Sequence, residues 1–147
     1  MARCGLALFC MCMATAATAC DGLQASQAWL REPPPGSTVL AAYFALTNTG
    51  SHAIAITGAG SPDFAQAMLH STAVVDGQMQ MRPLASFDLA PGARFAAAPG
   101  GAHLMLSEPN RPITTTTPVT ISIECSDGQA LTFAAPMRRD APTIITP

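Results

Sequence analysis

Short apolar runs that are rich in β-branched residues recur along the chain after residue 28, and turn residues separate them. The segment Val119–Cys125 shows this pattern most clearly, because Ile121 and Ile123 alternate there with Thr120 and Ser122. Alternation with a period of two is typical of a strand with one buried face and one exposed face. Helical periodicity is hard to find in the same region, so the pattern favours an all-β fold.

About eight strands are predicted in this way, over residues 39–47, 53–57, 65–72, 78–84, 94–97, 102–107, 119–125 and 130–134. Between two of them, Asp76-Gly77 is a strong signal for a hairpin turn. Thr114–Thr117 and the segment after Pro136 are predicted to be a loop and the chain terminus. Short strands at close spacing, without an internal repeat or a linker, predict one sandwich or barrel.

Length and charge narrow the class of protein. The chain has 147 residues, which suffices for one domain with a core and is too short for two ordinary domains. Its formal net charge is −2 and it contains no lysine. No basic stripe is present that could bind nucleic acid, so we expect no nucleic-acid partner.

The N-terminus has the pattern of a secretory signal peptide. Arg3 supplies a positive charge, Gly5–Met13 is an apolar run, and Ala17–Ala19 has the small residues of a cleavage site. The apolar run is too short to remain in a bilayer as a spanning helix, and no later segment approaches that length. We therefore predict a signal peptide over 1–19, an exported domain over 20–147, and no transmembrane segment.

Cleavage at this position would remove three of the five cysteines, Cys4, Cys10 and Cys12. Cys20 and Cys125 remain, and a pair of cysteines in an oxidising compartment favours a disulfide. The alternative is a lipid anchor on Cys20 after cleavage by a lipoprotein-type signal. Ala17 stands where that signal prefers leucine, so the disulfide and a soluble protein are favoured while the anchor stays open.

Four potential metal ligands stand at defined spacing in the middle of the chain. Ten residues separate His70 from Met81, twenty-one separate Met81 from His103, and one separates His103 from Met105. Imidazole and thioether form a soft, neutral ligand set, which suits Cu(I) better than zinc, calcium or magnesium. Neither ligand type is a cysteine thiol, so such a site can work where a cysteine ligand would be oxidised.

Strand geometry indicates how these side chains could meet. His103 and Met105 point to one face of their strand, while Leu104 and Leu106 point to the other, which we expect to face the core. His70 lies near the end of its predicted strand, just before the hairpin that carries Met81. We expect two strand pairs to converge at one end of a sandwich and bring the four groups together.

The remaining histidine and methionines have more ordinary interpretations. His52 lies beside a turn and is predicted to be a surface residue. Met68 and Met137 are predicted to be core or surface side chains, as most methionines of β proteins are. Met79 has the same interpretation, although it could also serve as a rim or substitute ligand.

With these motifs in hand, the chain resembles a family of bacterial periplasmic copper chaperones associated with the Cu-A centre of cytochrome c oxidase. The family signature is His, ten residues, Met, twenty-one residues and His-x-Met. Residues 76–83 (DGQMQMRP) and 99–106 (PGGAHLML) carry most of the resemblance. Residues 28–31, 34–36, 41–43 and 46–48 look like the opening strands of that family.

This resemblance implies that the protein is a cupredoxin-like Greek-key β-sandwich located in the periplasm. We expect it to be a monomer. The resemblance also implies one Cu(I) per chain at His70, Met81, His103 and Met105. The ion would pass by ligand exchange to a copper-accepting protein, either the Cu-A site of a cytochrome c oxidase subunit or another copper chaperone. Many relatives have a tail rich in methionine and histidine. The tail after Arg139 has neither residue, so we expect no second copper site there.

Enzymatic functions find little support in the sequence. Cys125 lies outside the ligand cluster, so the cysteine that a blue-copper site requires is missing. The chain has no GxSxG and no CxxC motif, which disfavours a serine hydrolase and a dithiol oxidoreductase. The alternatives are a metal-free periplasmic interaction module whose methionines form a soft contact surface, and a protein of copper storage or tolerance.

Overall fold

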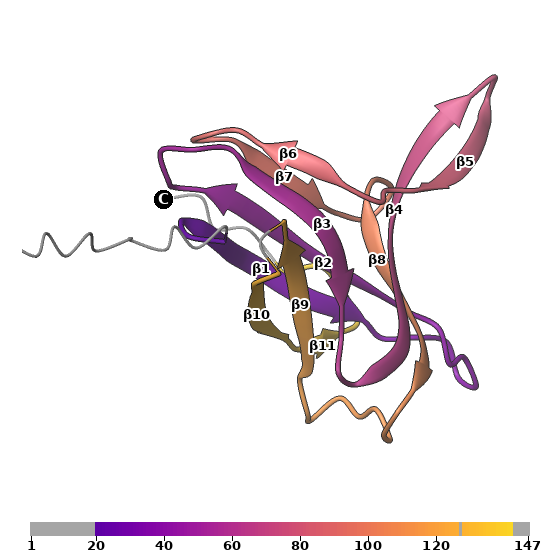
Figure 1. Cartoon of the computed structure of the whole chain (residues 1–147). Coiled ribbons are helices and arrows are strands. Elements are labelled where there is room, and N and C mark those ends of the chain that lie inside the picture. The colour runs from indigo at the N-terminus through magenta and orange to yellow at the C-terminus, as the bar shows by residue number, and fades with distance from the viewer. Residues whose placement is uncertain (1–19, 127, 143–147) are drawn as a thin grey trace, which may run out of the picture.

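Every regular element of the computed structural model is a β-strand within the described residues, 20–126 and 128–142 (Figure 1). In chain order the strands are β1 (Leu23–Arg31), β2 (Leu40–Asn48), β3 (Ile54–Gly60), β4 (Phe64–Val75), β5 (Gln78–Pro83), β6 (Phe87–Leu89), β7 (Arg94–Ala97), β8 (His103–Pro109), β9 (Val119–Cys125), β10 (Ala130–Ala135) and β11 (Met137–Arg138). This part of the chain contains no helix of the length and apolar character that crossing a membrane requires.

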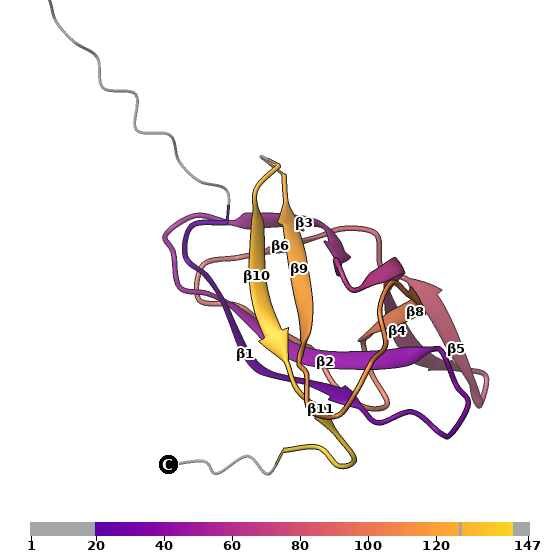
Figure 2. The ribbon, with the colours of Figure 1, turned by 90° about the horizontal axis from the view of Figure 1, so that it is seen from below.

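The strands form two sheets. The larger has the order β11-β1-β2-β8-β4-β5, with β7 also paired to β2, and the smaller has the order β10-β9-β3-β6. In Figure 2, β9 and β10 of the smaller sheet cross over β1 and β2 of the larger one. Since β2 pairs with β8 and β8 with β4, strands distant in sequence lie side by side, as in a Greek-key sandwich. The predicted all-β single domain is confirmed.

The core lies between the two sheets and consists of the apolar residues of alternating strand positions. The larger sheet contributes Leu30, Leu46, Leu104 and Leu106, all with no exposed surface. The smaller sheet contributes Ile56, Ile121 and Ile123, each at most 2% exposed. The alternation predicted for β9 is confirmed, because its burial follows a strict period of two from Val119 to Cys125.

Four parts of the fold differ from the expectation. β1 begins at Leu23, whereas the sequence indicated no strand before residue 28. β4 continues to Val75, so His70 lies within the strand rather than near its end. The three-residue strand β6 was not predicted. The segment after Pro136 is not wholly an unpaired terminus, because Met137 and Arg138 form β11 and pair in parallel with Leu30 and Arg31 of β1.

A disulfide joins Cys20 to Cys125, with 5.7 Å between the two Cα atoms. The predicted pairing is therefore confirmed, while the proposed signal peptide of residues 1–19 lies outside the described residues. The two cysteines are 105 positions apart in sequence. In the chain-entropy model, closing a loop of that size stabilises the fold by roughly 4–5 kcal/mol.

The β4–β5 hairpin extends beyond the sandwich as an arm (Figure 1). β8 pairs with β4 only between Phe64 and His70, whereas residues 71–75 pair with β5. At the tip, Asp76 and Gly77 have φ angles of 51° and 78°, which is the left-handed backbone of a type I′ turn. The predicted hairpin turn is confirmed, and it gives β5 a defined register on β4.

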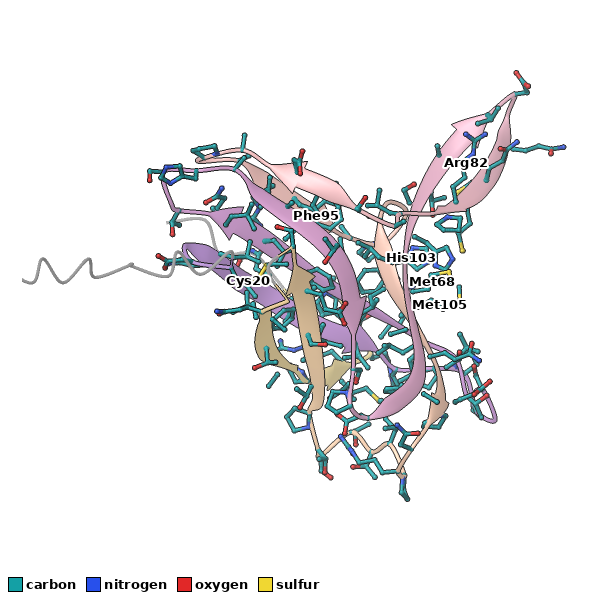
Figure 3. All side chains as sticks on the ribbon, in the orientation of Figure 1. Cys20, Met68, Arg82, Phe95, His103 and Met105 are labelled. Carbon is teal, nitrogen blue, oxygen red and sulfur yellow. A yellow bond between two sulfur atoms is a disulfide. The ribbon has the colours of Figure 1, made fainter. Side chains whose placement is uncertain are left out.

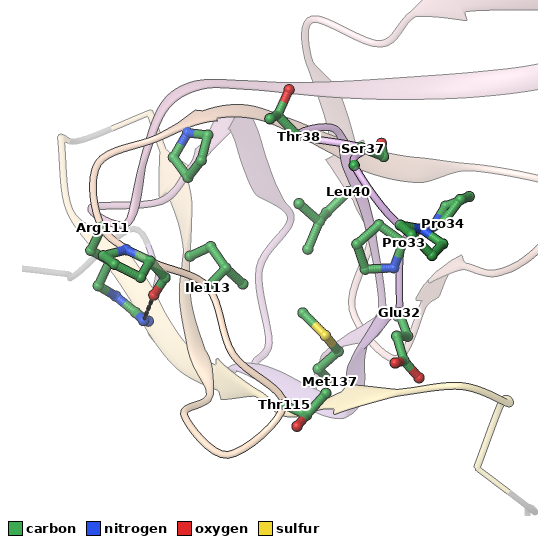
Figure 4. A pocket seen from close by; sticks show the side chains of 14 residues that line it. Glu32, Pro33, Pro34, Ser37, Thr38, Leu40, Arg111, Ile113, Thr115 and Met137 are labelled. Carbon is green, nitrogen blue, oxygen red and sulfur yellow. Dashed lines mark hydrogen bonds between the residues drawn. The ribbon is translucent and has the colours of Figure 1, made fainter.

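An ion pair holds the connection between β8 and β9 against the start of β4. Nε of Arg111 donates to Oδ1 of Asp63 at 2.6 Å, and the backbone N–H of Thr120 donates to Oδ2 at 2.8 Å. Arg111 also lines a hollow of about 360 Å³ between the β1–β2 and β8–β9 connections, where it donates to the carbonyl of Pro112 (Figure 4). The pair therefore fixes a long connection at the edge of the sandwich.

This ion pair predicts a pH dependence of stability. The hydrogen bond from Arg111 lowers the pKa of Asp63, the N–H of Thr120 lowers it further, and burial opposes both. A lowered folded-state pKa stabilises the fold fully above the unfolded value of about 3.9, and this contribution disappears as the pH falls through the folded value. The stability advantage of the wild type over Asp63→Asn should therefore be constant near neutral pH and shrink below about pH 4.

Urea unfolding at a series of pH values measures this advantage. The variant Asp88→Asn is the matched control, because Asp88 is an exposed carboxylate on β6. Its stability difference from the wild type should lack the acid-dependent loss attributed to Asp63. An Asp63→Asn difference that persists unchanged down to pH 2 would contradict the assignment.

Candidate metal centre

The candidate ligands lie on the face of the larger sheet that points away from the core. Leu69 of β4 and Leu104 of β8 face the core and are 6% and 0% exposed. Side chains alternate along a strand, so His70 and His103 lie on the opposite face. Met105 follows His103 by two residues and shares that face.

The two histidines are neighbours across the β4–β8 ladder. His70 is paired directly with His103, and their ring centroids lie 5.7 Å apart with an interplanar angle of 27°. Nδ1 of His103 lies 3.2 Å from the carbonyl oxygen of Gly101. Because a carbonyl only accepts, Nδ1 carries the proton of the neutral ring, and Nε2 keeps a lone pair with which to bind a metal.

His70 has a buried nitrogen that lacks a partner. Its Nδ1 is the one buried side-chain nitrogen or oxygen for which the described residues provide no hydrogen bond. A buried polar atom without a partner costs roughly 1–3 kcal/mol. A metal ion bound at Nδ1 would remove that cost, so the site fits the donor set that the sequence indicates.

Met81 lies on β5, on the other side of β4 from His103. It is paired with Thr72, two residues from His70 on the same face, and its side chain is 51% exposed. The four predicted ligands therefore lie on three adjacent strands of one sheet, in the order β8-β4-β5. This replaces the expected arrangement of two strand pairs converging at one end of the sandwich.

A further thioether, which was not predicted as a ligand from the sequence, lies beside the predicted ligands. Met68 is paired directly with Met105 and is 53% exposed, on the same face as His70. Figure 3 shows Met68, His103 and Met105 grouped on one side of the sandwich, with Arg82 further out on the arm. The position of Met68 two residues before His70 was the signal available in the sequence.

Of the other side chains considered in the sequence, His52 and Met137 lie away from this group, whereas Met79 shares the face of Met81 on β5. His52 is exposed in the turn after β2, where its Nδ1 is 3.0 Å from Oγ of Ser51. Met137 is partly buried and packs against the core. Met79 is 73% exposed on β5 and lies nearer the tip of the arm than Met81.

The donors favour a soft ion over a hard one. Among residues 20–126 and 128–142, no group of three or more His, Cys, Asp or Glu side chains is placed to hold a metal. Calcium and magnesium require oxygen ligands, and structural zinc sites use four His or Cys ligands in most cases. Two imidazoles beside several thioethers are a ligand set for Cu(I).

Comparison with known families places the chain. The family model described as "LpqE-like: Putative lipoprotein LpqE-like" matches residues 23–137. The chain belongs to the LpqE-like family. The chain is also similar to "Putative lipoprotein Lxx21020" of Leifsonia xyli subsp. xyli (strain CTCB07), with 32% identity over 119 residues, 80% of this chain and 70% of that protein.

Three solved structures of similar fold are informative for this LpqE-like protein. The apo PCuAC domain of PmoF2 has a TM-score of 0.64 and 21% identity, over 82% of this chain and 93% of that one. The copper-bound PCuAC domain of PmoF2 has a TM-score of 0.62 and 21% identity, covering 82% and 94%. The Cu(I) form of DR1885 from Deinococcus radiodurans has a TM-score of 0.55 and 28% identity, covering 80% and 77%. The predicted cupredoxin-like sandwich is confirmed.

Proposed function

We propose that this protein binds one Cu(I) per chain through His70, Met81, His103 and Met105 and passes it to a copper-accepting protein. The observation that carries this proposal is the adjacent histidine pair, in which Nε2 of His103 keeps a lone pair and the buried Nδ1 of His70 has no hydrogen-bond partner among the described residues. Thioethers lie beside this pair on the same face of the sheet.

The solved relatives support copper as the cargo. The PCuAC domain of PmoF2 and DR1885 are both described with bound copper, and DR1885 is described with Cu(I). They share the fold of this chain over about four fifths of its length. The motif spacing and the soft donors of this chain agree with the same cargo.

A carrier role follows from the exposure and the chemistry of the donors. A single thioether binds Cu(I) weakly, so each ligand can be replaced in turn by a ligand of the acceptor. Met81 is half exposed, which makes it accessible to such an acceptor. The proposed acceptor is a copper protein such as the Cu-A subunit of cytochrome c oxidase, and the proposed role is transfer rather than catalysis.

The location proposed for this carrier is outside the cytoplasmic membrane, after removal of residues 1–19. Relatives are described as putative lipoproteins, which agrees with export. The Cys20–Cys125 disulfide uses the thiol that a lipid anchor would require, so a soluble periplasmic form is proposed.

Intact-mass measurement of the exported protein tests this location and processing. We expect a mass that corresponds to cleavage before Cys20, lowered by the two hydrogens that the disulfide removes. Since Cys20 cannot carry a thioether-linked lipid while it is bonded to Cys125, an added diacylglyceryl mass would overturn the soluble assignment.

The metal site is tested by competition between the protein and a Cu(I) chelator. The mature protein should bind one equivalent of Cu(I) tightly and Cu(II) much more weakly, because its donors are soft. A variant with four substitutions should bind Cu(I) more than about a hundredfold more weakly. The substitutions are His70→Gln, Met81→Leu, His103→Gln and Met105→Leu. The thermal unfolding of this variant should stay close to that of the wild type, since these side chains lie outside the core.

The matched control is the double variant His52→Gln Met137→Leu, which changes the same residue types away from the site. It should bind Cu(I) as the wild type does. Equal binding by the quadruple variant and the wild type would contradict the assignment. Absence of Cu(I) binding by the wild type would favour a metal-free interaction module, for which the exposed Met79 and Met81 could form a contact surface.

A further inference from the structure

Four of the soft donors form a compact group on the β4–β8 ladder. His70 is paired with His103, and two residues further along the ladder Met68 is paired with Met105. All four side chains share one face, because directly opposed residues point the same way and the two pairs differ by two positions. These residues therefore occupy the corners of a rectangle.

The register places Met81 much further from Met105 than it places Met68. With about 4.8 Å between strands and about 3.3 Å rise per residue, a flat sheet would put Met68 and Met105 roughly 5 Å apart at Cα. The same spacings put Met81 roughly 8 Å from His70 but roughly 16 Å from Met105, on the far side of β4. Met81 reaches a metal held by Met105 only when the arm curls toward the ladder, whereas Met68 needs no movement of the backbone.

The surface beside the rectangle is hollowed. A hollow of about 550 Å³ is lined in part by Met68, His70 and Met105. Met68 is 53% exposed at its edge, so its thioether makes little contribution to the core. Both the open space and the exposure leave the sulfur free to approach an ion held by His70 and Met105.

We propose that Met68 is a further Cu(I) ligand, which takes the coordination position of Met81 when Met81 leaves. This inference rests on the proposed function. In the exchange the bond from copper to the sulfur of Met81 breaks, and a bond to the sulfur of Met68 forms. Copper stays Cu(I), and no proton or electron moves. An acceptor could then displace Met81 from the arm while His70, His103, Met105 and Met68 retain the ion.

A double-mutant cycle on Cu(I) affinity tests this exchange. Met68→Leu and Met81→Leu should each weaken binding by about tenfold or less, because the other thioether substitutes. The double variant should weaken it by at least about tenfold more than the product of the two single effects. Met137→Leu is the matched control, because Met137 packs against the core away from the ladder, and it should bind as the wild type does.

Methionine-methyl NMR spectra during Cu(I) titration supply an independent readout. In the wild type, the methyl signals of Met105 and Met81 should move, and in Met81→Leu the signal of Met68 should move with that of Met105. The inference is overturned if the Met68 signal stays fixed in Met81→Leu and the effects of the two single substitutions on Cu(I) affinity simply multiply in the double variant. The proposed copper carrier would then still stand. A wild type that binds no Cu(I) would overturn both.

Discussion

The pairing register between β4 and β8 is the constraint on which the rest of this structure depends. It sets Leu69 beside Leu104 in the core and His70 beside His103 on the opposite face. A slip of one residue would send every side chain of a strand to the other face. Burial of the leucines therefore also fixes where the imidazoles lie, because the free energy that specifies the core specifies the ligand positions.

The sandwich and the arm contribute differently to the site. Three donors, His70, His103 and Met105, lie on strands anchored by buried neighbours. Met81 lies on β5, which pairs with β4 alone in the larger sheet. The proposed carrier would benefit from this division, since a rigid set of ligands would retain the ion while a peripheral ligand yields to an acceptor.

Much of the site could be predicted from local sequence, because strand alternation is a local property. Leu104 and Leu106 indicated that His103 and Met105 face away from the core, and the burial of both leucines agrees. Asp76-Gly77 indicated the hairpin that carries Met81, and the left-handed backbone of both residues agrees. The neighbour of a strand in a sheet has no such local signal. The pairing of Met68 with Met105 therefore became visible only in the structure.

There are also physical reasons why the sequence pattern did not reveal β1, β6 and β11. In β1 the register shifts between Ser26 and Trp29, and Gln27 has a φ angle of 56°. A bulge of this kind interrupts the alternation of buried and exposed residues, so a search for a period of two fails. β11 has two residues and β6 has three, which is too short for any period to appear.

In the proposed metal centre, methionine and histidine side chains hold Cu(I) on the exposed face of the larger sheet. Copper K-edge X-ray absorption of the mature protein with one equivalent of Cu(I) tests it most directly. If the proposed signal peptide is removed with its three cysteines, the two that remain belong to the disulfide, so sulfur bound to copper must come from methionine. We expect both nitrogen and sulfur atoms bound directly to copper. The sulfur should be lost when Met68, Met81 and Met105 are replaced by leucine. A shell of nitrogen and oxygen without sulfur in the wild type would contradict the proposal.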